Sequence, residues 1–148
     1  MKKESVLILC TGNSCRSQMA EGVLRHYGSE RFEVVSAGTK PSVVNENAIK
    51  VMQEIGIDIS KHRSKHVSEF LGRHFNYIIT VCDQAKESCP IFPGNSVRLH
   101  WYFPDPPHGQ AGTEAVLNEF RRTRDLIHEK FKHAAEQGIQ SPSIPDDF

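Results

Sequence analysis

One stretch decides the fold of this chain: Cys10-Thr11-Gly12-Asn13-Ser14-Cys15-Arg16-Ser17. It follows the apolar run Val6 to Leu9 and precedes an amphipathic segment that begins near Ser17. This order predicts a buried strand, a tight loop and a helix, with the backbone amides of the loop turned inward. A ring of N–H groups at the positive end of a helix is an anion site. We therefore expect the loop to bind a small tetrahedral oxyanion.

The same stretch supplies a nucleophile and a clamp. Cys10 stands at the base of the loop, where the amides and the helix dipole should ionise its thiol more readily than a free cysteine, which titrates near about 8.5. The Arg16 guanidinium can hold two oxygens of the anion. The residues expected to bind the substrate are Thr11, Gly12, Asn13, Ser14, Cys15, Arg16 and Ser17.

Individual loop residues have separate expected roles. Gly12 is expected to permit a backbone turn closed to other residues, and Asn13 to tolerate the left-handed conformation while bracing the loop. Ser17 is expected to donate its hydroxyl to the Cys10 thiolate. Cys15 is interpreted as a loop cysteine that faces the core rather than as a second catalytic thiol.

Length and composition limit the classes of protein. The chain has 148 residues, 18 basic and 18 acidic side chains, and no dense basic patch with interleaved aromatics, so we expect neither a nucleic-acid partner nor a second domain. No apolar run approaches the roughly 20 residues of a membrane span, and the first residues lack a secretory core. We expect a cytoplasmic monomer with a catalytic domain at 1–138 and a tail at 139–148.

Strands and helices alternate along the rest of the chain. This alternation predicts an α/β domain: a four-stranded parallel sheet in the order 2-1-3-4, with helices on both faces and the phosphate-binding loop after the first strand. The expected strands are Val6 to Leu9, Phe32 to Ala37, Tyr77 to Val81 and Val97 to Trp101. The expected helices cover 17–27 with Gly28 as cap, 45–55, a short piece at 67–73, and 113–138, whose Arg121, Arg122 and Arg124 are interpreted as a solvated face.

Two later stretches should meet the loop at the carboxyl edge of the sheet, where ligands bind in open parallel sheets. Cys82 directly follows the third strand, and Asp105 lies in the rigid sequence Pro104-Asp105-Pro106-Pro107. Between Cys82 and Cys89 the sequence predicts a short, marginal helix. Seven helical steps of about 1.5 Å would place their α-carbons about 10 Å apart. A disulfide needs about 7 Å or less, so the segment must unwind if these cysteines join.

The cysteines leave other interpretations open. Cys82 and Cys89 could instead be a buried core thiol and a surface thiol. A zinc site is disfavoured, because the spacings between Cys10 and Cys15 and between Cys82 and Cys89 do not match the usual short ligand loops. We expect no metal and no organic cofactor.

Cys10-x5-Arg16-Ser17, Asp105-Pro106 and the alternation of strands and helices resemble the low-molecular-weight tyrosine phosphatase fold. Within that fold, residues 10–21 together with Cys82 and Cys89 resemble the thioredoxin-coupled arsenate reductases. The resemblance implies that Cys10 attacks arsenate while Asp105 protonates the departing oxygen. It further implies that Cys82 displaces arsenite, and that Cys89 then forms a disulfide with Cys82 for thioredoxin to reduce.

Two rival functions remain at this point. A tyrosine phosphatase would need Cys10, Arg16 and Asp105 but no segment that unwinds, and a non-catalytic oxyanion sensor would use its redox state to act on a partner. The resemblance also implies a potassium ion in some reductases, held at positions 13, 21, 36 and 65. Position 65 is Lys65 here, so we expect its ammonium to replace the cation beside Glu21.

Overall fold

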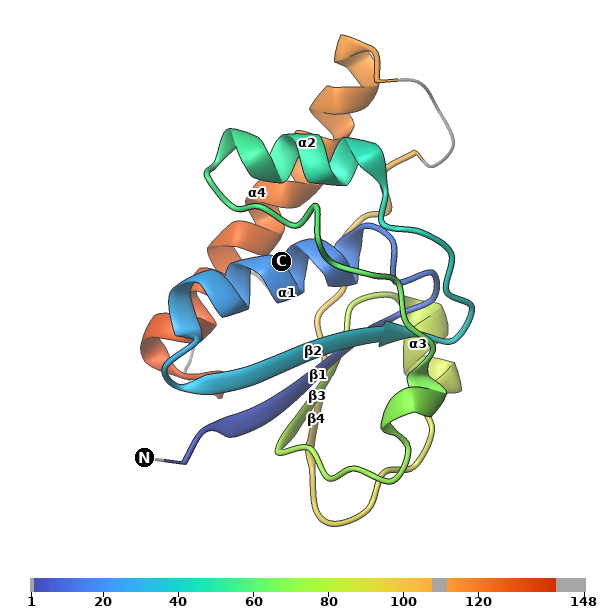
Figure 1. The fold of residues 1–148 in the computed structure, drawn as a ribbon, viewed down its shortest axis with the longest axis vertical. Coiled ribbons are helices and arrows are strands. Elements are labelled where there is room, and N and C mark those ends of the chain that lie inside the picture. Colours follow the sequence, from blue (N-terminus) through green and yellow to red (C-terminus); the bar gives the residue numbers. More distant parts are fainter. Residues whose placement is uncertain (1, 108–111, 141–148) are drawn as a thin grey trace.

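The computed structural model describes residues 2–107 and 112–140 (Figure 1). Along the chain the elements are β1 (Glu4–Cys10), α1 (Arg16–Gly28), β2 (Phe32–Gly38), α2 (Glu46–Glu54), the 3₁₀ helix η1 (Val67–Phe70), β3 (Tyr77–Thr80), α3 (Asp83–Ser88), β4 (Val97–His100) and α4 (Glu114–Gln137). These elements agree with the predicted order. The piece expected at 67–73 is shorter and of 3₁₀ type.

The four strands form one parallel sheet in the order β2-β1-β3-β4, which confirms the predicted topology. The apolar run Val6 to Leu9 lies in the central strand β1 and is fully buried. Cys10 is paired with Gly38 at the end of β1, and Leu9 is paired with Thr80 of β3. The register therefore aligns the carboxyl ends of these strands at one edge, where Cys10 and Cys82 emerge.

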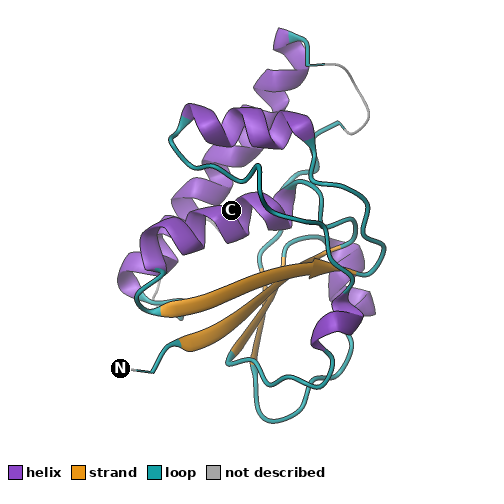
Figure 2. Cartoon of the chain, viewed as in Figure 1, coloured by secondary structure: helices purple, strands orange, loops and turns teal. Residues whose placement is uncertain are grey.

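Helices flank the sheet and supply most of the remaining core. Figure 1 shows α1 packed along the sheet beside α4, with α2 outside them, and Figure 2 shows the same layers by element type. The apolar face predicted for the last helix is buried, since Phe120, Ile127 and Phe131 have no exposed surface. In contrast, α3 and η1 lie together near the end of the sheet where the strands point (Figure 1).

Gly28 is not the left-handed cap expected from the sequence. It is the last residue of α1, and the residue after it, Ser29, keeps a helical φ of −62°. A Cβ at Gly28 would lie 3.1 Å from both the Ala135 Cβ and the Phe32 ring. The glycine is therefore needed for close packing of α1 against α4 rather than for backbone conformation.

Arg124 corrects a second expectation, because it does not belong to a solvated face. Only 9% of its surface is exposed, and Nη1 donates to the Val51 carbonyl at 2.9 Å and to Glu54 Oε1 at 2.8 Å. Arg121 also pairs with Glu54, at 2.7 Å. The charged side of α4 thus holds α2 in place.

The end of the described chain packs on the fold. Ile139, in the segment predicted as a tail, is 5% exposed and belongs to the core, whereas residues 141–148 of that tail lie outside the described residues. Among the described helices, none combines the length and the apolar character required to cross a bilayer.

Candidate active site

A cavity of about 530 Å³ opens at the carboxyl edge of the sheet. Its walls combine the loop after β1 with the start of α3 and the loop after β4. The lining residues are Cys10, Thr11, Gly12, Ser14, Cys15, Arg16, Gln84, Asp105, Pro106 and Pro107. Most of the residues expected to bind substrate therefore face one cavity. Asn13 and Ser17 do not; both are completely buried beneath the loop. Pro106 and Pro107 belong to the rigid stretch that was expected to meet the loop, whereas Gln84 was not expected from the sequence.

Arg16 provides the positive wall of this cavity. Its Nη1 donates to the Phe103 carbonyl at 3.0 Å, and its Nη2 lies 3.5 Å from Asp105 Oδ2. Its Nε is buried and has no hydrogen-bond partner among the described residues. A buried donor without an acceptor is costly unless a ligand satisfies it. The guanidinium is thus held in place from two sides and keeps a donor for an oxyanion.

Asn13 rather than Gly12 takes the unusual backbone conformation of the loop. Its φ is 47°, the single positive φ of a non-glycine residue in the described chain. Its side chain is held on both ends: Nδ2 donates to Ser17 Oγ at 2.8 Å and to Ser36 Oγ at 2.9 Å, and Oδ1 accepts from the Lys65 amide at 2.9 Å. The predicted brace is present. Gly12 does not have a positive φ, so the turn of the loop is made at Asn13 and not at the glycine.

Gly38 is a structural requirement that the sequence analysis missed. A Cβ at this position would lie 2.4 Å from the Thr11 carbonyl oxygen and 2.9 Å from the Asn13 amide nitrogen. The last residue of β2 must therefore be glycine so that the loop can cross it. The sequence did carry a signal for this close approach, because a glycine stands at the end of the predicted second strand.

The loop that carries Asp105 is anchored from α4. The Thr123 hydroxyl donates to the Pro104 carbonyl at 3.0 Å, and Thr123 is 2% exposed. The Asp105 side chain is 47% exposed and lies across the cavity entrance from the nucleophile loop. A carboxyl there can give a proton to a departing oxygen.

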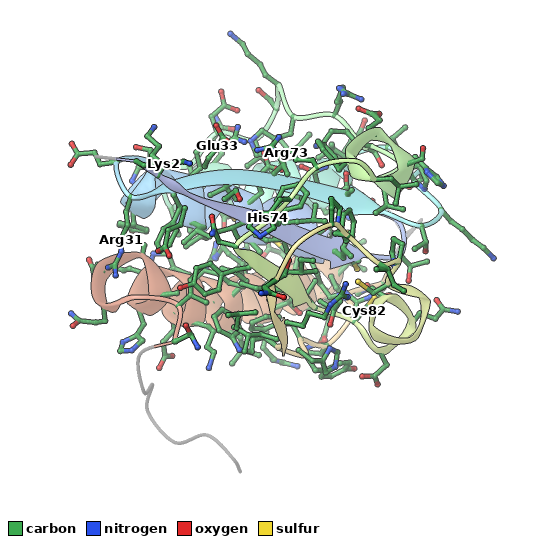
Figure 3. All side chains as sticks on the ribbon, turned by 90° about the horizontal axis from the view of Figure 1, so that it is seen from below. Lys2, Arg31, Glu33, Arg73, His74 and Cys82 are labelled. Carbon is green, nitrogen blue, oxygen red and sulfur yellow. The ribbon has the colours of Figure 1, made fainter. Side chains whose placement is uncertain are left out.

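Cys82 lies beside the loop, as its place after β3 predicted. It is 3% exposed, and its Sγ is 3.4 Å from Thr11 Oγ1. Figure 3 shows it next to α3, at the end of the sheet away from Lys2 and Arg31. A hydrogen bond with the Cys10 thiol, and further ones with the Thr11 hydroxyl and the Ala85 amide, lower the pKa of Cys82 to about 5.

The expected ionisation of Cys10 is therefore reversed in the free protein. The hydrogen bond with Cys82 and burial raise the pKa of Cys10 above its ordinary value, although Arg16 and the Thr11 amide act in the opposite direction. The two thiols titrate as a coupled pair, in which this contact favours ionisation of Cys82 over ionisation of Cys10. The reason is that two thiolates in contact would repel each other, an effect that the isolated loop does not contain.

Cys89 is not part of the cavity. It follows α3, is partly buried, and receives a hydrogen bond from Arg98 Nη1 at 3.0 Å. The structure thus brings Cys10, Arg16, Asp105 and Cys82 together and leaves Cys89 at the far end of the short helix.

The buried carboxylate beneath the loop is paired with two basic side chains. Glu21 is buried, and Arg25 Nη2 and Lys65 Nζ lie 2.8 Å and 3.8 Å from its oxygens. Burial lowers the pKa of Lys65, and the Glu21 carboxylate opposes that change. Two basic groups therefore already balance the carboxylate that a potassium ion would need. Among residues 2–107 and 112–140, no cluster of three or more His, Cys, Asp or Glu side chains is arranged to hold a metal.

Comparison with known proteins places this geometry in context. The profile described as low molecular weight phosphotyrosine protein phosphatase matches residues 5–141. An arsenate reductase of Halalkalibacterium halodurans is 44% identical over 138 residues, which cover 93% of this chain and 99% of the relative. A solved arsenate reductase in its oxidized state is 30% identical, with a TM-score of 0.77 over 90% of this chain and 98% of that one. The tyrosine phosphatase Wzb from Escherichia coli K30, solved with sulphate, shares the fold at 24% identity and a TM-score of 0.74, covering 92% of this chain and 99% of its own.

Proposed function

The chain belongs to the low molecular weight phosphotyrosine protein phosphatase family, and within it we propose that this protein reduces arsenate to arsenite. The observation that carries the proposal is a second thiol at the nucleophile loop: Cys82, 3.4 Å from Thr11 Oγ1 and hydrogen-bonded to Cys10. Hydrolysis of a phosphoester has no use for this sulfur. Reduction needs it, because a thiol must supply the electrons that convert arsenic(V) to arsenic(III).

Arsenate would bind in the cavity among the loop amides and the Arg16 guanidinium, whose Nε lacks a protein acceptor. The proton of Cys10 must leave before attack, and the adjacent Cys82 sulfur is a basic group that can receive it. The Cys10 thiolate then forms a sulfur–arsenic bond. Asp105, which faces the same cavity, protonates the departing oxygen, and that oxygen leaves as water.

Cys82 would act in the second step. Its thiolate attacks the Cys10 sulfur of the adduct and forms a Cys10–Cys82 disulfide. The electron pair of the sulfur–arsenic bond passes to arsenic, which leaves as arsenite. The balance is one arsenate and two thiols converted to one arsenite, one disulfide and one water. The proton that Cys82 received must leave it again before this attack, because only the thiolate is nucleophilic.

Cys89 would then attack the Cys82 sulfur, which releases Cys10 as a thiol and leaves a Cys82–Cys89 disulfide. A thioredoxin-type dithiol would reduce this disulfide by two electrons. Such a relay requires a reducing compartment, which supports a location in the cytoplasm. Every group used comes from one chain, so a monomer is sufficient.

The decisive experiment measures arsenite production with thioredoxin, thioredoxin reductase and NADPH. The intact protein should turn over repeatedly. Cys82→Ser should lose turnover, whereas Val43→Ser, a change at an exposed position outside the cavity lining, should retain it. Catalytic arsenite production by Cys82→Ser would refute the relay.

Phosphatase activity is a second candidate function, because Cys10, Arg16 and Asp105 face one cavity as phosphoester hydrolysis requires. Phosphate and arsenate have nearly the same shape, so the cavity discriminates between them weakly. Cys82→Ser should keep the rate of aryl phosphate hydrolysis within about threefold, whereas Cys10→Ser should abolish both activities. A protein that hydrolyses aryl phosphates but makes no arsenite would be a phosphatase.

A further inference from the structure

Two side chains of the edge strand β4 contact the two ends of the segment between Cys82 and Cys89. Arg98 and His100 occupy alternate positions of β4, so their side chains leave the strand on the same face. His100 contacts Asp83, the first residue of α3, and Arg98 contacts Cys89 and Pro90, which follow its last residue. A short helix is thus held at both ends by one rigid strand.

The contact at the start of α3 is part of a chain of hydrogen bonds. His100 Nε2 lies 2.9 Å from Asp83 Oδ1, and His100 Nδ1 lies 2.8 Å from Thr80 Oγ1. Because a carboxylate only accepts, Nε2 donates its proton to Asp83. These contacts connect β3, β4 and α3 through one imidazole ring.

The contact at the end of α3 uses both arms of one guanidinium. Arg98 Nη1 donates to Cys89 Sγ at 3.0 Å, and Nη2 donates to the Pro90 carbonyl at 3.2 Å. A planar fork that binds two adjacent acceptors fixes their direction as well as their distance. Cys89 is accordingly held beside β4, away from the cavity that contains Cys10.

We propose that Arg98 and His100 are positioning residues that hold this segment in its helical, dithiol form and thereby favour reduction of the Cys82–Cys89 disulfide. The proposal rests on the relay described above. Cys82 and Cys89 are the extended residues that flank the six-residue helix α3. Seven helical steps would already span about 10 Å, and an extended residue rises further per step, so the pair exceeds the span of about 7 Å that a disulfide allows. Forming the disulfide must therefore move at least one end of the segment and break at least one of the two contacts.

The direction of the effect follows from linkage. Contacts that exist only in the dithiol form stabilise that form, so they make the disulfide a better oxidant of the external reductant. Reduction breaks the Cys82–Cys89 bond, and two electrons and two protons come from a dithiol that is itself oxidised. A strand that holds the reduced segment thus helps each catalytic cycle to be completed.

The test is a redox titration in buffers of reduced and oxidised dithiothreitol, with alkylation and peptide mass spectrometry to quantify the Cys82–Cys89 disulfide. Arg98→Met, His100→Phe or both should shift the equilibrium about fivefold toward the disulfide, according to which contact the disulfide breaks. For this two-electron couple that is about 20 mV. Arg98→Lys, which can reach one acceptor but not both, should shift it less. Arg122→Met, which removes an arginine paired with Glu119 on α4, is the matched control and should leave it unchanged.

A merely structural role would lower the melting temperature of both redox forms equally, whereas the proposed role lowers that of the dithiol form alone. Asp83→Ala removes the His100 contact from the exposed side, and so provides the same test if His100→Phe does not fold. A disulfide that forms in the intact protein but has the same equilibrium in all these variants would overturn the proposal. An intact protein that never forms the Cys82–Cys89 disulfide would instead refute the relay itself.

Discussion

The Thr123 hydroxyl of α4 donates a hydrogen bond to the Pro104 carbonyl at 3.0 Å, and Pro104 directly precedes Asp105. Thr123 is nearly completely buried, so no water competes for this bond. The acid of the proposed reaction is exposed, but the backbone that carries it is fixed from the longest helix. The position of Asp105 over the cavity therefore depends on a residue eighteen places further along the chain.

Thr123→Val should reduce the chemical step without blocking substrate binding. The change keeps the shape but removes the donor, which leaves a carbonyl unsatisfied and allows the Asp105 loop to move. We expect kcat to fall about tenfold, because misplacement of a reacting group by a fraction of an ångström has effects of this size. The KM for arsenate should stay within about twofold, since the loop and Arg16 are untouched. Thr123→Ser keeps the hydroxyl and should retain the rate; an equal loss in both variants would contradict this role.

Gly38→Ala should disturb the nucleophile loop from below. The added Cβ would lie 2.4 Å from the Thr11 carbonyl oxygen. That oxygen is a backbone atom, and the position of a Cβ is set by its own backbone, so neither atom can rotate away. We expect a loss of about 2 kcal/mol in the free energy of unfolding, in the range of overpacked sites. Phosphate that binds in the cavity should raise the melting temperature of the intact protein, and we expect the variant to lose this rise. Gly72→Ala, where no atom lies within 4 Å, is the control and should change neither quantity.

Cys82 should carry a thiolate at neutral pH. Its pKa of about 5, lowered chiefly by the Cys10 hydrogen bond, means that the sulfur is ionised above that pH and becomes protonated as the pH falls through it. Ultraviolet thiolate absorbance measured against pH should show one transition near pH 5 in the intact protein. Cys82→Ser should lack it. A single transition near the ordinary pKa of a thiol would show that the two cysteines do not titrate as a coupled pair.

Potassium should not stimulate this protein. Lys65 Nζ lies 3.8 Å from Glu21 Oε1, so an ammonium already occupies the neighbourhood of the buried carboxylate. Replacing sodium by potassium at constant ionic strength should leave the melting temperature and the turnover unchanged. Lys65→Asp places a second carboxylate beside Glu21. This variant should have a lower melting temperature than the intact protein in sodium, and potassium should restore part of that difference. A clear potassium effect on the intact protein would contradict the substitution of cation by lysine.

Glu54 should stabilise the protein at neutral pH and not in strong acid. Arg121 and Arg124 lower its pKa from 4.5 to about 2, so its contribution is present above the unfolded value and disappears as the pH falls through the folded one. Because the carboxylate is about one-third exposed, Glu54→Gln should cost about 1 kcal/mol at pH 7. Thermal unfolding should show that the two proteins converge near pH 2. A pH-independent difference would indicate a packing effect instead.

Much of the fold was predictable because its signals are local. The apolar run Val6 to Leu9 predicts a buried strand, and Asn45 predicts the start of α2, whose first amides it does cap. Right-handed connections then limit the order of the strands. The same reasoning correctly placed Cys10, Arg16, Asp105 and Cys82 at one edge.

Other features depend on residues that are distant in sequence. Gly28 is required by Ala135, and Arg124 is buried by its contacts with α2. Neither partner lies within the few residues over which helical periodicity or capping acts. From sequence alone a charged side chain is predicted to be solvated, because only the packed structure shows that it is buried together with its partners.

By itself the sequence determined the strand, loop and helix that join Cys10 to Arg16, because strand burial, loop length and helix start all act within some twenty residues. The coupling of the Cys10 and Cys82 thiols came only from the tertiary structure, since it depends on Cys82 reaching Cys10 from another strand. The tertiary structure also decided that Gly38 must lie under the loop and that Arg98 and His100 hold α3. These are contacts between separate strands and helices, and their energies exist only once the sheet has assembled.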